Sequence, residues 1–131
     1  MFVDASAIVA ILTGESDAEV LAGRLEAASQ PVTSAVAVFE AAAGVSRKKA
    51  CSVPVARDFV FRFLSAADVD IVPIREREAV LALEAFDRFG KGRHPAGLNM
   101  GDCFAYAGAC ARGVSLLFKG DDFARTDLGS G

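Results

Sequence analysis

The chain contains few of the residue types that are common in small binding sites. Its 131 residues include no tryptophan, one tyrosine, one histidine and three cysteines. The odd cysteine count and the absence of a C-x-x-C spacing argue against a disulfide framework and against a zinc site. Without disulfides, a cytoplasmic location is the default expectation. The single histidine, His94, lies in a glycine-rich loop and is assigned no catalytic role.

Long hydrophobic runs and a large charge of either sign are also missing. No apolar stretch reaches the length of a membrane span, and no basic segment precedes an apolar core at the N-terminus, so we expect neither membrane insertion nor a signal peptide. The formal net charge of −3 excludes a uniformly basic nucleic-acid binder. Two local basic clusters are either solvated surface or a rim that guides a polyanion: Arg47, Lys48 and Lys49, and Arg88, Lys91 and Arg93.

What the chain does contain is enough apolar sequence for one sizeable core. It is 53% hydrophobic and 24% charged, which predicts a single folded domain over residues 1–131. Apolar runs predict strands at residues 1–4, 31–33, 70–74 and 114–118, and helical periodicity predicts helices at residues 5–12, 17–28, 35–50, 54–64, 75–89 and 101–113. This alternation predicts an α/β fold with a parallel sheet of four or five strands and helices on both faces.

Two of the predicted helices have informative apolar faces. In the helix over residues 75–89, Ala79, Leu83, Phe86 and Phe89 are spaced to point into the core. The helix over residues 54–64 has a wider apolar surface than one packing stripe needs. That helix is therefore either buried on more than one side or in contact with a partner chain.

Acidic residues stand at the ends of several apolar segments. Asp4 ends the first strand, Glu40 lies within an otherwise apolar helix, Asp102 lies at the start of a helix, and Asp121 and Asp122 follow the last predicted strand. Sites in parallel α/β folds form beyond the carboxyl ends of the strands, so these carboxylates can meet in one crevice.

Several carboxylates that converge on one point require a compensating cation. Mg²⁺ and Mn²⁺ prefer oxygen ligands, and a bound metal lowers the pKa of its water. The chemistry indicated is phosphodiester hydrolysis, with an activated water in line with the leaving 3′-oxygen. Taken singly, Asp102 is also explained as a helix-terminal charge and Asp122 as a turn residue, but their joint placement favours a metal site. Ser6 either caps the first helix or binds a metal water or phosphate.

At these residues the sequence resembles the PIN-domain family, and most of all the VapC-type ribonuclease toxins of bacterial toxin–antitoxin pairs. The resemblance rests on four segments in matching order and spacing: MFVDASA (residues 1–7), VFE (38–40), LNMGDCFAYA (98–107) and LFKGDDF (117–123). It spans nearly the whole chain. A lone V-D-x-S would be weak, whereas N-x-G-D-C-F-A-Y-A followed by L-L-F-K-G-D-D-F is specific.

The resemblance implies a three-layer PIN fold and a Mg²⁺- or Mn²⁺-dependent endoribonuclease. Asp4, Glu40 and Asp102 match the family's first three acidic positions, and Asp122 matches the fourth, although the adjacent Asp121 leaves that choice open. Asp4 and Asp102 would be the central metal ligands, and Glu40 and Asp122 would complete the cluster. Supporting positions would be Ser6, Asp121 and Thr126, and Asp127 completes with Thr126 the family's trailing T-D.

The resemblance also implies partners. Toxins of this kind act on RNA, commonly form homodimers and are encoded with a small antitoxin that wraps the toxin, blocks the acidic site and binds operator DNA. The broad apolar helix over residues 54–64 fits a surface covered by such a partner.

Two other functions compete with a ribonuclease. A phospho-acceptor receiver domain has a similar length, but it needs an aspartate at the end of its third strand, and the segment Asp70-Ile71-Val72-Pro73-Ile74 ends without one. A PIN-fold module that binds partners without cutting RNA is disfavoured by the complete set of acids.

Overall fold

A four-stranded parallel sheet organises the protein. The computed structural model describes residues 1–120 and 122–128. The strands are β1 (Phe2–Val3), β2 (Val32–Ser34), β3 (Asp70–Val72) and β4 (Leu116–Leu117). They lie in the order β3-β2-β1-β4, and every paired neighbour is parallel. The predicted parallel α/β sheet is therefore confirmed, with four strands in the described part of the chain.

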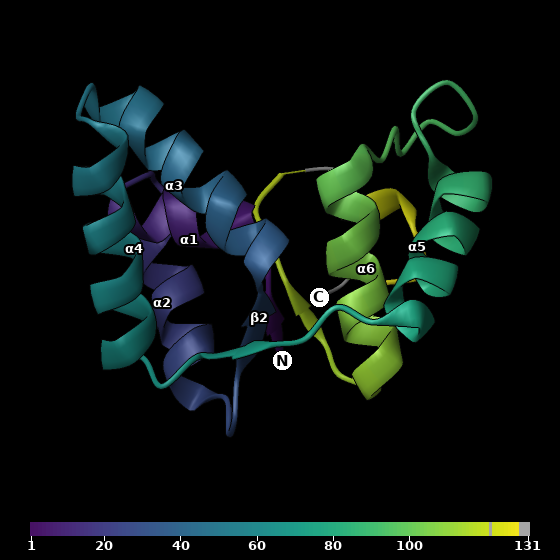
Figure 1. The fold of residues 1–131 in the computed structure, drawn as a ribbon, viewed down its shortest axis with the longest axis horizontal. Helices are drawn as coiled ribbons and strands as arrows, with labels where there is room; N and C mark the ends of the chain where they lie inside the picture. The colour runs from purple at the N-terminus through teal and green to yellow at the C-terminus, as the bar shows by residue number, and fades with distance from the viewer. Residues whose placement is uncertain (121, 129–131) are drawn as a thin grey trace.

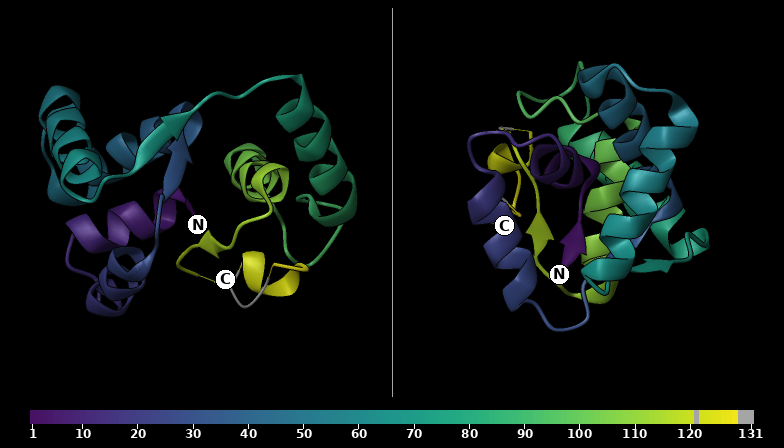
Figure 2. Two further views of the ribbon diagram at one scale, coloured as in Figure 1. Left: turned by 90° about the horizontal axis from the view of Figure 1, so that it is seen from below. Right: turned by 90° about the vertical axis from the view of Figure 1, so that its left-hand side faces the viewer.

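Helices cover both faces of this sheet, as predicted. One layer holds α1 (Ala5–Leu12), α2 (Ala18–Ala27), α3 (Ala35–Lys49) and α4 (Val53–Ala66), and the other holds α5 (Glu76–Phe89) and α6 (Met100–Arg112). Figure 1 shows the first layer on the left of the sheet and the second on the right, and the left view of Figure 2 shows the same separation from below. After β4 the described part of the tail forms a 3₁₀ turn, η1 (Phe123–Arg125), and residues 118–120 and 122–128 contain no fifth strand.

The strand residues explain why two hydrophobic cores form. Successive side chains of a strand point to opposite faces of the sheet. Phe2 and Leu116 accordingly pack into the core beneath α5 and α6, whereas Val3 and Leu117 pack into the core beneath α1 to α4. All four side chains are essentially inaccessible to solvent. The two central strands are thus held from both sides, which places their carboxyl ends rigidly.

Helix α5 presents a different face from the one its spacing predicted. Its buried residues are Ala82, Ala85 and Phe89, while Leu83 is 69% exposed and Phe86 is 39% exposed. The small alanine side chains let α5 pack closely on α6, and this contact rotates the larger apolar residues towards solvent. The prediction that Leu83 and Phe86 point into the core is therefore wrong, and an apolar surface is left uncovered.

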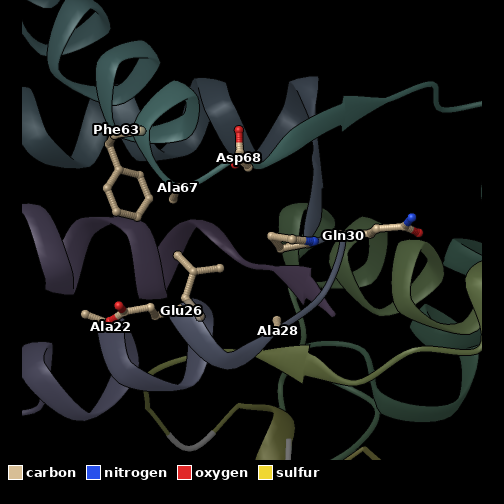
Figure 3. A pocket seen from close by; sticks show the side chains of 10 residues that line it. Ala22, Glu26, Ala28, Gln30, Phe63, Ala67 and Asp68 are labelled. Atoms are coloured by element: carbon tan, nitrogen blue, oxygen red, sulfur yellow. The ribbon is translucent and has the colours of Figure 1, made fainter.

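The amino ends of the strands carry a separate cavity, shown in Figure 3. It measures about 530 Å³ and lies between the last turns of α2 and α4, next to Gln30 and Pro31, which precede β2. Its ionisable lining groups are Glu26 and Asp68. This cavity lies at the edge opposite the predicted carboxylates, so it is not the centre of their chemistry. None of the helices in residues 1–120 and 122–128 combines the length and apolar character that crossing a membrane requires.

Candidate active site

Asp4 stands where β1 ends and α1 begins, beside the place where the strand order reverses between β1 and β4. Its side chain is 4% exposed, and its Oδ2 accepts hydrogen bonds from the Ser6 backbone N (3.0 Å) and the Ser6 Oγ (2.5 Å). Burial raises the pKa of Asp4 above its ordinary value, although the bonds from Ser6 act in the opposite direction. The N-cap of α1 is therefore Asp4, and the prediction that Ser6 caps this helix is wrong.

Ser6 instead joins the ends of β1 and β4. Its Oγ accepts a hydrogen bond from the backbone N of Lys119 at 2.9 Å, and the backbone N of Asp4 donates to the Leu117 carbonyl at 3.0 Å. These bonds bring the chain that follows β4 alongside the start of α1. The tail residues are therefore delivered to the same sheet edge as Asp4, as the parallel topology predicts.

Asp102 is held at the start of α6 by a reciprocal capping box. Its backbone N donates to the Asn99 Oδ1 (2.9 Å), and its Oδ2 accepts from the Asn99 backbone N (3.1 Å). Burial raises the pKa of Asp102 to about 7, and the negative charges of Asp4 and Asp122 act in the same direction, against the bond from Asn99.

Glu40 reaches this group from α3, and Figure 1 shows α3 and α6 approaching each other beyond the strand ends. Its carboxyl packs directly against Gly101, the residue before Asp102, so closely that a Cβ at position 101 would overlap it. Burial, and then the charge of Asp4, raise the pKa of Glu40. Glu40 is thus half-buried beside the acidic start of α6 rather than solvated on the outside of its helix.

Asp122 lies immediately before η1 and is exposed. The next residue, Phe123, is 2% exposed and packs edge-on against Phe118, with ring centroids 5.2 Å apart. This buried ring anchors the segment, and the charge of Asp122 contributes to the raised pKa of Asp4 and Asp102. Asp121, the alternative fourth acid, lies outside the described residues.

The two residues of the trailing T-D bond away from the carboxylates. The Thr126 Oγ1 donates to the Phe123 carbonyl (2.7 Å) and accepts from the Leu128 backbone N (3.1 Å), so it closes the turn. Asp127 accepts a 2.6 Å hydrogen bond from the hydroxyl of Tyr106, whose ring is buried in the core, and its Oδ2 lies 3.8 Å from Nη2 of Arg88. These contacts fasten the tail that carries Asp122 to α5 and α6.

The donor set suits a hard divalent cation. All four groups are carboxylates, and Asp4, Glu40 and Asp102 have raised pKa values because of burial and, in each case, a neighbouring carboxylate. A bound cation would reverse those shifts by stabilising the ionised forms. In residues 1–120 and 122–128, however, no three acidic, histidine or cysteine side chains lie close enough together to chelate one ion. The carboxylates are neighbours but would have to draw closer to share an ion.

Asn99 and Gly101 are the residues that the sequence prediction missed as parts of this site. Asn99 enters the prediction only within the motif LNMGDCFAYA, although an asparagine three residues before an acid at a helix start is a capping signal. Gly101 offers no local signal, because its importance comes from Glu40, which is distant in the sequence.

A sequence model of the PIN domain matches residues 1–128. The chain therefore belongs to the PIN-domain family. Within that family it is similar to proteins named as VapC ribonucleases. One from Rhizobium meliloti is 41% identical over 140 residues, which cover 98% of this chain and 99% of that protein. Ribonuclease VapC of Mycolicibacterium smegmatis is 41% identical over 128 residues, covering 98% and 97%, and ribonuclease VapC30 of Mycobacterium tuberculosis is 40% identical, covering 98% and 95%.

Proposed function

We propose that this protein is a Mg²⁺- or Mn²⁺-dependent endoribonuclease and the toxin of a toxin–antitoxin pair. The observation that carries the proposal is that Asp4, Glu40, Asp102 and Asp122, from four distant parts of the chain, are neighbours at the strand-order reversal. The similarity to VapC ribonucleases over nearly the whole chain supports the same activity. We also propose that residues 1–131 form one such domain.

The residues divide into ligands and supports. Asp4 and Asp102 would hold the cation, and Glu40 and Asp122 would complete the cluster from either side. Ser6 orients Asp4 through two hydrogen bonds, and Asn99 orients Asp102 through the capping box. A bound Mg²⁺ or Mn²⁺ would supply charge neutralisation for the phosphodiester and a lowered pKa for the attacking water. The protein's own task is to hold these oxygens in place and to position the RNA strand.

The direct test is cleavage of total RNA by the purified protein with Mg²⁺, with Mn²⁺ and with chelator. Cleavage should require the metal and should be lost in Asp4→Asn and Asp102→Asn, whose isosteric side chains preserve packing but weaken cation binding. Glu26→Gln, far from the site at the other edge of the sheet, is the matched control and should cut normally. Circular dichroism and the melting temperature verify folding. Wild-type cleavage by Asp4→Asn in Mn²⁺ would refute the role of Asp4.

The same assay distinguishes a ribonuclease from a PIN domain that binds partners without cutting RNA. The second function is correct if the folded wild-type protein binds RNA or its partner but leaves RNA intact with both metals. Growth inhibition on expression, relieved by Asp102→Asn, provides an independent readout of the toxin proposal.

The uncovered apolar side chains are consistent with a protein partner. Phe39 is 77% exposed, Leu83 is 69% exposed and Met100 is 68% exposed, and α4 exposes Phe59 and Phe61. We propose that an antitoxin and a second copy of the chain cover these faces in the cytoplasm, and that the antitoxin links the complex to DNA. Light scattering of the protein alone and after co-expression with the protein encoded by the neighbouring gene would test both associations.

A further inference from the structure

A groove of about 330 Å³ leads away from Glu40 between α1, α3 and the chain that follows β4. We call it the α1–α3 groove. One side of α3 lines it with Glu40, Gly44, Arg47 and Lys48, because residues four, seven and eight positions apart lie on the same side of a helix. Its lining therefore changes from acidic beside the catalytic carboxylates to basic at the far end.

Small side chains line the bottom of the groove. Ala5 and Ser6 line it from α1, and Gly44 lines it from α3. A Cβ at Gly44 would come within 2.8 Å of the Val9 Cγ2, so glycine allows the two helices to approach closely. The groove is an open trough, which is the shape that an extended backbone can occupy.

At the basic end of the groove, two lysine side chains already contact a carboxylate oxygen of the protein itself. The Nζ atoms of Lys48 and Lys119 both contact the Oε1 of Glu15, at 2.8 Å and 3.2 Å. Lys119 also contacts Asp17 at 3.2 Å, whereas Lys48 keeps two ammonium protons beyond its bond to Glu15. Arg47 stands exposed beside them, and within the described residues it makes no hydrogen bond or ion pair. Two cations meeting at one carboxylate oxygen present the charge and spacing that a phosphate oxygen requires.

We propose that the α1–α3 groove holds an RNA backbone phosphate near the scissile one, with Lys48 and Arg47 as its binding residues and Glu15 as a positioning residue. This inference rests on the proposed ribonuclease function. Because the chain has a net charge of −3, RNA that approaches the carboxylates needs a local positive surface beside them. Glu15 holds Lys48 and Lys119 in place, and a phosphate shares or displaces its contact.

The test compares Lys48→Gln with Lys49→Gln, which removes the same charge from the same end of α3 but does not line the groove. The full-length protein is assayed with a labelled pool of single-stranded RNA. Binding is measured in EDTA and cleavage in Mg²⁺, both at a series of KCl concentrations. Lys48→Gln should weaken binding about 3- to 10-fold at low salt and raise KM, with kcat little changed. It should also reduce the salt-dependence slope by about 0.7, the value for one phosphate contact on a single strand.

Glu15→Gln provides the second arm. The amide keeps a hydrogen-bond acceptor for both lysines but removes the competing charge, so RNA should bind about threefold more tightly. Melting temperatures of all variants separate this effect from a loss of folding.

The outcomes separate this inference from the ribonuclease proposal. If the wild type cuts RNA and Lys48→Gln matches Lys49→Gln in affinity and salt slope, the groove inference is wrong and the ribonuclease stands. If RNA binds in a Lys48-dependent way but is never cut, the ribonuclease proposal fails, and the groove is upheld only as an RNA-binding site with no scissile phosphate beside it. Preference of the groove for an acidic polyglutamate peptide, with RNA affinity unaltered in Lys48→Gln, would also overturn the inference.

Discussion

The carboxyl group of Glu40 lies in the space that a side chain at Gly101 would fill. A Cβ built at position 101 would overlap the carboxyl carbon and both oxygens of Glu40. Gly101 is therefore the point of close approach between α3 and the start of α6, one residue before Asp102. The acidic centre depends on the absence of a side chain at this position as well as on the presence of its carboxylates.

Gly101→Ala should separate activity from stability. Alanine fits the first turn of a helix and is favoured there over glycine, so α6 should form normally. The added methyl group must push Glu40 away from Asp102, and we expect RNA cleavage to fall about 10- to 100-fold, the range for lost support of a metal site. Gly23→Ala is the control, since a Cβ at this position of α2 meets nothing within 4 Å. Wild-type cleavage rates in Gly101→Ala would show that the position of Glu40 is unimportant.

Asn99→Ala should weaken both α6 and the site. It removes the side-chain acceptor that caps the helix, which costs about 1 kcal/mol of unfolding free energy. It also removes one of the two bonds that join residue 99 to Asp102, so Mg²⁺ affinity should fall about tenfold. Urea unfolding and a Mg²⁺ titration measure the two effects.

Asn99→Ser is the matched variant, because serine is also a good N-cap. It should recover most of the stability and of the metal affinity. If Asn99→Ser is as impaired as Asn99→Ala, the capping role assigned to the side chain is incorrect.

The spacing of apolar residues predicted the fold because it indicates which side of each helix or strand is buried. Each of the four predicted apolar strands has a counterpart in the parallel sheet. The apolar spacing did not predict where each strand ends. The third strand was predicted to reach Ile74, but it ends at Val72 because its partner there, Ser34, already begins α3.

The site was predictable to the extent that its residues stand at element ends. Asp4 and Asp102 could be placed at one sheet edge from topology alone, because each follows or opens a recognisable element. The contact between Glu40 and Gly101 could not be predicted, since it depends on how α3 and α6 are inclined. The outward rotation of Leu83 and Phe86 has the same origin, because packing between α5 and α6 selects one of several apolar faces on α5.

The stability of the metal-free protein should fall as pH rises through neutrality. The pKa of Asp102 is raised from 3.8 to about 7 in the folded state, so folding favours its protonated form. The resulting stabilisation is complete below pH 3.8 and is lost as pH rises through about 7. Asp4 and Glu40 shift in the same direction. In chelator, the melting temperature should therefore decrease between pH 5.5 and pH 8.5, by several degrees.

Three comparisons identify the cause of that decrease. Asp102→Asn should flatten the pH dependence, whereas Glu19→Gln, on the exposed side of α2, should keep the wild-type slope. Mg²⁺ should raise the melting temperature more at pH 8.5 than at pH 5.5, since protons compete with the cation for the same oxygens. A melting temperature that rises towards pH 8.5 in chelator would contradict the assigned shift.

Tyr106→Phe should loosen the tail without disturbing the core. The ring is buried and remains in the variant, but the 2.6 Å hydrogen bond to Asp127 is lost. Since Asp127 is half-exposed, water can replace the lost donor, and the cost in unfolding free energy should be about 1 kcal/mol or less. The tail carries Asp122 to the other carboxylates, so greater motion there should reduce cleavage several-fold while leaving α6 intact. Hydrogen exchange should report faster opening of residues 122–128 with unchanged protection in α6. Asp127→Asn, which keeps an acceptor for Tyr106, should retain more activity than Tyr106→Phe. A larger loss in Asp127→Asn than in Tyr106→Phe would mean that charge pairing with Arg88, rather than the hydrogen bond, fastens the tail.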